Sequence, residues 1–197
     1  AQQPELLGIR EAVRQAADAE GVRLASAGSH PFARHRERLV YPDDRYQGLI
    51  DRNRWVARRL MIFGLHVHVG MTCGEHAMAM INGLLPYLPH LLGLSASSPF
   101  WQGSDTGLAS SRITIFEALP TAGHPCTFRD WADFERVHDA MIASRAITSV
   151  KDIWWDIRPH PDYGTIELRI CDGLPTLGEI TALVAVVHAL CARLDER

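Results

Sequence analysis

The sequence predicts an α+β fold, with helices packed on one face of a mainly antiparallel sheet. Residues 64–70 (Gly-Leu-His-Val-His-Val-Gly) and 164–172 (Gly-Thr-Ile-Glu-Leu-Arg-Ile-Cys-Asp) both alternate apolar and polar side chains, as a half-buried strand does. Segments with apolar residues at helical spacing surround them. The chain has 197 residues, 47% hydrophobic and 22% charged, which suits a single domain over residues 1–197.

The helices are predicted from apolar spacing and from start and stop residues. Gly21 ends the first, two prolines interrupt the apolar region after residue 85, and Thr176 with Glu179 forms a capping-box signature. The predicted helices are residues 5–20, about 46–59, 74–85, a second apolar segment ending near Ser95, 110–118, 129–144, and one from 176 that runs apolar to Leu190 and ends in 193–197.

Further strands are predicted at residues 22–27 and 153–160. The turn residues 161–164 lead directly from the second of these into the 164–172 strand, so we expect an antiparallel hairpin there. The loop at residues 95–107 is dense in hydroxyl groups, which suits either a functional loop or an ordinary surface connection.

Composition excludes several classes of function. A net charge of −3 and a pI near 6.4 do not predict nucleic-acid binding. Lys151 is the single lysine and Asp152 follows it, so the chain has no P-loop. The four cysteines lack a C-x-x-C spacing, and the apolar stretches at 81–96 and 182–192 are too short or too interrupted to cross a membrane. We expect a soluble cytoplasmic protein with reduced thiols.

The two alternating strands carry the candidate chemistry. His66 and His68 share one face of the first strand, and Glu167 and Arg169 share one face of the second. If both apolar faces are buried together, imidazoles, a carboxylate and a guanidinium meet on one surface, a candidate site for metal and phosphate. The alternative is an ordinary polar face with a cross-strand ion pair. Asp156 and Arg158 allow the same two interpretations.

No nucleophile motif supports covalent catalysis. Two mechanisms therefore remain open from the residues alone. One is metal-assisted hydrolysis, with the histidines and Glu167 holding an ion that activates water. The other is phosphoryl transfer with Mg²⁺ and arginines neutralising phosphate charge. Histidine ligands favour zinc or manganese somewhat, and carboxylates favour magnesium.

Several segments together resemble one family, in order and in spacing. These are Gly28-x-His30-Pro31-Phe32, residues 64–70, residues 94–101 (Leu-Ser-Ala-Ser-Ser-Pro-Phe-Trp) with Asp105-Thr106-Gly107, residues 155–160 (Trp-Asp-Ile-Arg-Pro-His), and residues 164–169. The chain resembles the bacterial carboxylate–amine ligases of the glutamate–cysteine ligase type 2 family. The resemblance implies a catalytic core similar to that of glutamine synthetase, with ATP and Mg²⁺, or Mn²⁺ in its place, bound at an antiparallel sheet. It also implies that ATP phosphorylates a substrate carboxylate and that an amine attacks the acyl phosphate. The assigned reaction of the type forms γ-glutamylcysteine, in glutathione biosynthesis.

The resemblance also implies roles for single residues. His66 and Glu167 match metal-binding positions, and His68 would face nucleotide or substrate. Arg169 would contact the transferring phosphate. Arg112 and Arg158 are the candidates for holding the substrate carboxylate, and Arg158 is also a candidate catalytic residue.

The chain departs from the family at both flanks. Family members open with a Gly-x-Glu-x-Glu strand whose glutamates bind metal, and they continue past the helix that ends here near residue 197. We therefore expect an incomplete catalytic core that is inactive alone and that self-associates into a homo-oligomer. The alternatives are a metal-dependent hydrolase and an inactive core that serves as a binding or assembly module. In the ligase interpretation the partners are small molecules: glutamate or another carboxylate, and cysteine or another amine.

Overall fold

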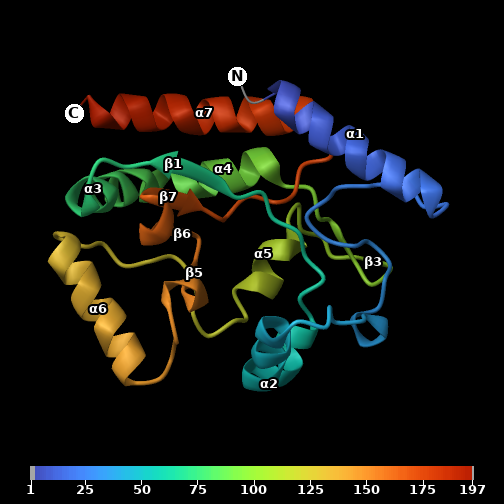
Figure 1. Cartoon of the computed structure of the whole chain (residues 1–197), viewed down its shortest axis with the longest axis horizontal. Coiled ribbons are helices and arrows are strands. Elements are labelled where there is room, and N and C mark those ends of the chain that lie inside the picture. Colours follow the sequence, from blue (N-terminus) through green and yellow to red (C-terminus); the bar gives the residue numbers. More distant parts are fainter. Residues whose placement is uncertain (1–2, 197) are drawn as a thin grey trace.

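The computed structural model describes residues 3–196 and has the predicted α+β architecture (Figure 1). Its central sheet has three antiparallel strands in the order β1 (Val67–Gly70), β7 (Thr165–Leu168) and β6 (Ile157–His160). The tight turn at Pro161–Tyr163 joins β6 to β7, which confirms the predicted hairpin.

Seven α-helices lie among the described residues. They are α1 (Gln3–Ala19), α2 (Asp44–Arg58), α3 (Gly74–Leu84), α4 (Leu88–Ser95), α5 (Ser111–Phe116), α6 (Trp131–Ala143) and α7 (Leu177–Asp195). Single turns of 3-10 helix occur at His35–Glu37, Leu85–Tyr87 and Val150–Asp152. Two short pairs complete the fold: β2 (Phe100–Trp101) with β3 (Ser104–Asp105), antiparallel, and β4 (Ala122–Gly123) with β5 (Trp154–Trp155), parallel.

One face of the central sheet forms the core. Val67, Ile166 and Leu168 point to this face and pack with buried side chains of α3, α4 and α7. In Figure 1, α7 runs along this side of the sheet, while α5 and β5 lie on the other. The alternation of apolar and polar residues in β1 and β7 therefore has the predicted result: the apolar side chains pack against the helices, and the polar side chains face α5 and β5.

The predicted start of α7 is confirmed. The Thr176 hydroxyl accepts a hydrogen bond from the Glu179 backbone N–H, and the Glu179 carboxylate accepts one from the Thr176 backbone N–H. The helix ends at Asp195. Of the predicted helix end at residues 193–197, Arg197 lies outside the described residues.

Two strand predictions are wrong in detail. Residues 22–27 form no strand, because Val22 and Leu24 are exposed and the segment has no neighbouring strand to pair with. Residues 153–160 form two short strands with a break at Asp156. There the Asp156 backbone N–H donates to the Gly123 carbonyl at 2.9 Å, away from the central sheet.

Two helical stretches, Gly74–Ser95 and Leu177–Asp195, are long and apolar enough to cross a membrane by length and composition. Core helices of soluble proteins pass the same test. In this structure the first stretch is divided by the turn at Leu85–Tyr87, and α3 and α7 both pack on the central sheet.

Candidate active site

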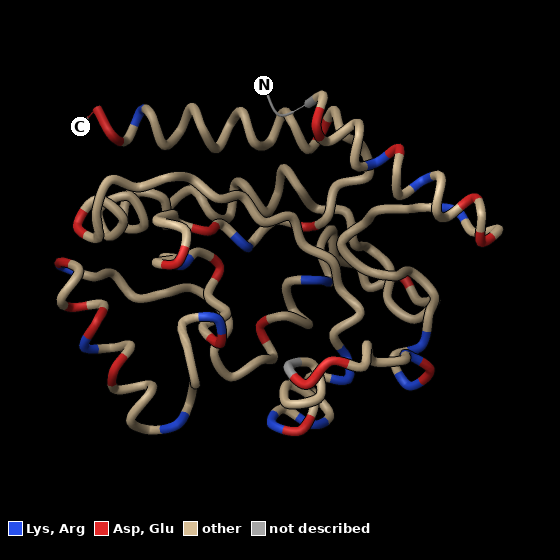
Figure 2. Tube along the Cα trace, in the orientation of Figure 1, with Lys and Arg blue, Asp and Glu red and all other residues tan. Residues whose placement is uncertain are grey.

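The polar face of the sheet brings the predicted site residues together. The strand register places His68 opposite Glu167, and Glu167 opposite Arg158, so the three side chains form one row across β1, β7 and β6. Figure 2 shows acidic and basic residues close together along these strands.

A second row lies one step along the strands. His66 and Arg169 lie just beyond the paired residues of β1 and β7, and both contact Glu167, through His66 Nδ1 at 2.9 Å and Arg169 Nη1 at 2.6 Å; the Arg169 backbone N–H also donates to the Asp156 carbonyl at 2.7 Å. The prediction that both histidines, Glu167 and Arg169 share one surface is therefore confirmed.

The side chains of these two rows, His66, His68, Arg158, Glu167 and Arg169, form a charged cluster. Glu167 is its centre. Its side chain is almost fully buried, and its carboxylate accepts hydrogen bonds from Arg169 Nη1 at 2.6 Å and from Arg158 Nε at 2.8 Å. His66 Nδ1 lies 2.9 Å from Oε1 of the same carboxylate. Burial alone would raise the pKa of Glu167, but the hydrogen bond from His66 and the charges of the two arginines hold it far below its usual range. Glu167 is therefore a carboxylate at any physiological pH.

The other charged groups of the cluster respond to the same burial. Burial and repulsion from Arg158 lower the pKa of Arg169 to about 10, so this guanidinium is still charged at neutral pH. Burial also lowers the pKa of His68, although the charge of Glu167 opposes the shift. His68 is thereby favoured in its neutral form, in which one ring nitrogen can accept a hydrogen bond.

A cavity of about 350 Å³ adjoins the cluster on the side of His68. His68 Nδ1 lies 2.9 Å from the Thr165 hydroxyl, and its ring contacts that of His160. His160 and Thr165 line the cavity, together with Cys73 and Trp131. His68 therefore contacts two residues that line a space large enough for part of a ligand.

Arg158 is placed in the cluster, but its guanidinium is already occupied. Besides Glu167, it donates through Nη1 to the backbone carbonyls of Val150, Lys151 and Ile153 at 2.6 to 3.0 Å. Its side chain is buried. The geometry favours a role in positioning Glu167 over the predicted contact with a substrate carboxylate.

Arg112 lies apart from the surface of the cluster. It is 2% exposed, and its guanidinium donates to the backbone carbonyls of Arg169 and Ile170, both at 2.9 Å. A side chain at Gly64 would overlap this guanidinium, so the glycine is required for the close approach. Arg112 therefore supports the strand that carries Arg169, and this geometry too favours a structural role over substrate binding.

The serine-rich loop is used to build the fold. Asp172 is fully buried and accepts hydrogen bonds from the Ser97 backbone N–H and from the hydroxyls of Ser98 and Ser110. Its carboxylate also lies 3.9 Å from Arg112. These residues therefore have a buried structural role, which differs from both the functional loop and the ordinary surface connection that the sequence suggested.

Sequence reasoning missed one pair of titratable residues. His124 Nδ1 lies 2.6 Å from Oδ2 of Asp156, whose side chain is buried. The two residues are 32 positions apart, and nothing in the local sequence around His124 indicates the contact. The feature that reveals the contact is the break between β5 and β6 at Asp156, and this break is seen only in the structure.

The cluster fits a divalent metal ion as a partial ligand set. Among residues 3–196, no group of three or more His, Cys, Asp or Glu side chains has a geometry that can hold a metal ion. Two cis ligands of an octahedral Mg²⁺ with bonds of about 2.1 Å lie about 3 Å apart, however. His66 Nδ1 and Glu167 Oε1, at 2.9 Å, match that separation, although His66 would have to give up its hydrogen bond to Glu167 for both atoms to bind one ion. These two residues can thus contribute to a site that substrate phosphates and water complete.

Comparisons with known proteins agree on one family. The family model described as glutamate–cysteine ligase family 2 (GCS2) matches residues 1–197. A protein of Bdellovibrio bacteriovorus, "Putative glutamate–cysteine ligase 2", is 56% identical over 192 residues, which cover 98% of this chain and 50% of the relative. Similarly named proteins of Frankia alni and Thermobifida fusca are each 48% identical, over 97% and 93% of this chain and 50% and 46% of their own length. The chain spans about half the length of these curated relatives.

Proposed function

We propose, since this chain belongs to glutamate–cysteine ligase family 2, that it is the catalytic core of an ATP-dependent carboxylate–amine ligase. The first candidate substrates are glutamate and cysteine, which would give γ-glutamylcysteine. ATP would phosphorylate the carboxylate, and the amine would displace phosphate from the acyl phosphate.

The observation that carries this proposal is the charge of the cluster. Two guanidinium groups, those of Arg158 and Arg169, surround a single carboxylate, and His66 and His68 lie beside it with partly exposed side chains. This excess of positive charge suits an anion such as a phosphoryl group. Arg169, which makes fewer backbone contacts than Arg158, is the residue we assign to the transferring phosphate.

We assign Mg²⁺, or Mn²⁺ in its place, to His66 and Glu167. When bound there, the ion would neutralise phosphate charge during transfer. We assign to His68 a contact with the nucleotide or substrate; its support is the hydrogen bond to Thr165, a residue that lines the neighbouring cavity.

A soluble cytoplasmic location and self-association also belong to this proposal. The charge of −3 gives no basic field for nucleic acid, and the two apolar helices pack on the sheet. Because the chain spans about half the length of its relatives, we expect full activity from a protein of the relatives' length and little activity from this chain alone.

A metal-dependent hydrolase is the second candidate. His66 and His68 both approach Oε1 of Glu167, at 2.9 and 3.8 Å, and two imidazoles with a carboxylate are the ligand types of a water-activating ion; their side chains would have to rearrange to hold one. A hydrolase would retain zinc or manganese after dialysis, whereas the ligase would need added Mg²⁺ and ATP.

The test is ADP release from ATP and Mg²⁺ with glutamate and cysteine, for this chain and for the protein at its relatives' length. ADP release by the longer protein that requires both amino acids would support the ligase. Retained metal without dependence on ATP would favour the hydrolase. An inactive longer protein that binds neither ATP nor metal would favour the binding or assembly module.

A further inference from the structure

His124 and Asp156 form a pair with the geometry of a proton acceptor and its orienting carboxylate. The Asp156 side chain is 1% exposed, whereas that of His124 is 48% exposed. His124 Nδ1 faces the carboxylate at 2.6 Å. Among the described residues, Nε2 of His124 has no hydrogen-bond partner. A buried carboxylate of this kind holds the proton on Nδ1 and leaves Nε2 free to accept one.

The backbone fixes this pair against the charged cluster. Asp156 lies opposite Arg169 on the polar face of the sheet, through the hydrogen bond from the Arg169 N–H to the Asp156 carbonyl. His124 follows β4, and the φ of 101° at Gly123 is a left-handed conformation that favours glycine. The Asp156 backbone therefore links the His124–Asp156 pair to the strand segment that carries Arg169, the arginine that we assign to phosphate.

Both acidic and basic groups lie near this pair. Glu117, at the end of α5, interacts electrostatically with both Asp156 and His124. The residue as a whole is exposed, but the partial burial of its carboxyl group and the charge of Asp156 raise the pKa of that group. Arg112 of α5 and Arg169 are the cations near Asp156. The two groups that interact with His124 itself, Glu117 and Asp156, are both carboxylates, which suits the approach of a cationic amine to this imidazole.

We propose that His124, oriented by Asp156, is the general base that accepts the proton of the amine substrate. This inference rests on the proposed ligase function and adds a residue to it. The amine nitrogen forms a bond to the acyl carbon of the acyl phosphate, and the carbon–oxygen bond to phosphate breaks with its electron pair. Because the amine arrives as an ammonium ion, two protons leave it. The first goes to Nε2 of His124 before the attack and frees the nitrogen lone pair, and the Asp156 carboxylate stabilises the imidazolium; the second goes to the departing phosphate.

The test compares two nucleophiles in the protein at its relatives' length. Cysteine carries a protonated amino group at neutral pH, whereas hydroxylamine is largely uncharged and needs less help from a base. For His124→Asn, we expect kcat with cysteine to fall about 10²- to 10⁴-fold. With hydroxylamine the loss should stay below about tenfold, because acyl phosphate formation does not require His124.

The pH profile supplies a second readout. The wild-type rate with cysteine should rise across the range in which histidine side chains lose their proton, about pH 5 to 8, and His124→Asn should lose that rise. Asp156→Asn, which keeps the shape but removes the charge, should show the same selective loss.

His138→Asn is the matched control, because His138 also pairs with a carboxylate, that of Asp139 at 3.2 Å, but on the outer helix α6. It should leave both rates unchanged. Equal loss with both nucleophiles, or no loss with cysteine, in a folded His124→Asn variant would overturn the role of His124. A wild-type protein that forms no ADP with either nucleophile would instead contradict the ligase function itself.

Discussion

At the scale of single residues, the site is built around one buried carboxylate and the groups that neutralise it. Glu167 is 3% exposed and is contacted by Arg158, Arg169 and His66. A buried charge with this many partners is stable only while the partners remain. The residues of the site therefore carry folding stability as well as chemistry.

Arg158→Lys is predicted to destabilise the fold. A lysine ammonium cannot reproduce the fork that contacts Glu167 and three backbone carbonyls, so we expect a loss of about 2–5 kcal/mol in the free energy of unfolding. Chemical denaturation measures this loss. Arg193→Lys, at an exposed pair with Glu196 near the end of α7, is the control and should change stability by less than about 0.5 kcal/mol. Equal stability of both variants would contradict the positioning role of Arg158.

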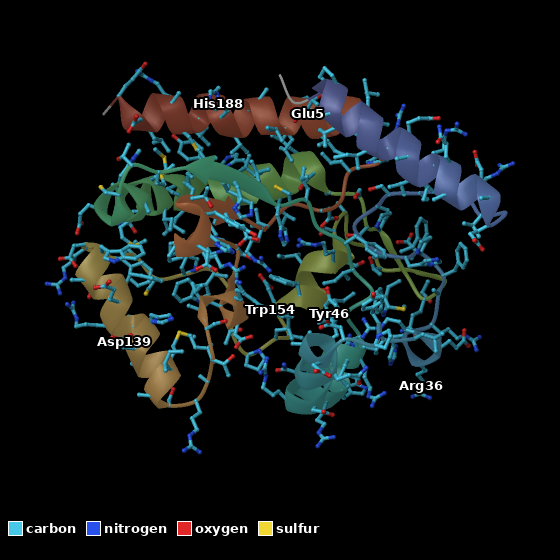
Figure 3. The ribbon with its side chains drawn as sticks, viewed as in Figure 1. Glu5, Arg36, Tyr46, Asp139, Trp154 and His188 are labelled. Carbon is cyan, nitrogen blue, oxygen red and sulfur yellow. The ribbon has the colours of Figure 1, made fainter. Side chains whose placement is uncertain are left out.

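The pH dependence of stability follows from Glu167 and His68. Both have a pKa lowered by folding, so the unfolded chain binds their protons first as the pH falls. Stability should decrease below about pH 6.5 as His68 is protonated in the unfolded chain, and again below about pH 4.5 for Glu167. Unfolding titrations of Glu167→Gln should show a smaller decrease in the acidic range. Glu5→Gln, on α1 and far from the site in Figure 3, should keep the wild-type slope.

At the scale of elements, one carboxylate joins segments that are distant in the sequence. Asp172 follows β7 and binds the loop between α4 and α5 through Ser97, Ser98 and Ser110. A side chain at Gly28 would overlap this carboxylate, so a third segment closes around it. A second contact between distant segments is the stacking of Trp154 of β5 on Phe116 of α5. Figure 3 shows Trp154 between these two elements and α2.

Asp172→Asn should loosen this junction. An amide presents N–H groups where the carboxylate accepts, so at least one buried donor loses its partner, and we expect a loss of about 2–4 kcal/mol. Asp105→Asn is the control, because Asp105 is exposed in the same loop and accepts from the Gly107 backbone N–H. A denaturation midpoint that moves equally in both variants would contradict the account of the loop.

The sequence predicted the two strands of the site because alternation of apolar and polar side chains is a local pattern. His66, His68, Glu167 and Arg169 were placed together correctly on that basis. The contacts of Arg112 and Asp172 could not be predicted, because they join residues 57 to 75 positions apart. The strand predicted at residues 22–27 failed for a related reason: β propensity forms a strand only where a partner strand is available.

At the scale of the whole molecule, the outer helix α7 is apolar over most of its length. The charged residues of α7 lie near its ends, and the middle of the helix is uncharged in Figure 2. Val186 on α7 and Leu7, Ile9 and Val13 on α1 are exposed. Exposed apolar surface of this kind favours association.

We therefore predict that the chain self-associates. Sedimentation velocity should show a weight-average mass that increases with concentration, and Val186→Glu should shift the distribution towards the monomer. His188→Gln, on the outer side of α7 in Figure 3, should leave it unchanged. A single monomer species at high concentration would contradict the predicted homo-oligomer.

The ligase proposal is tested most directly by following an oxygen atom. In the full-length protein, glutamate labelled with ¹⁸O in its γ-carboxylate is incubated with ATP, Mg²⁺ and cysteine, and the inorganic phosphate is analysed by mass spectrometry. If ATP phosphorylates the carboxylate at the Glu167–Arg169 cluster, each phosphate released with product carries one ¹⁸O. Product formed together with unlabelled phosphate would contradict an acyl phosphate intermediate and, with it, the central claim.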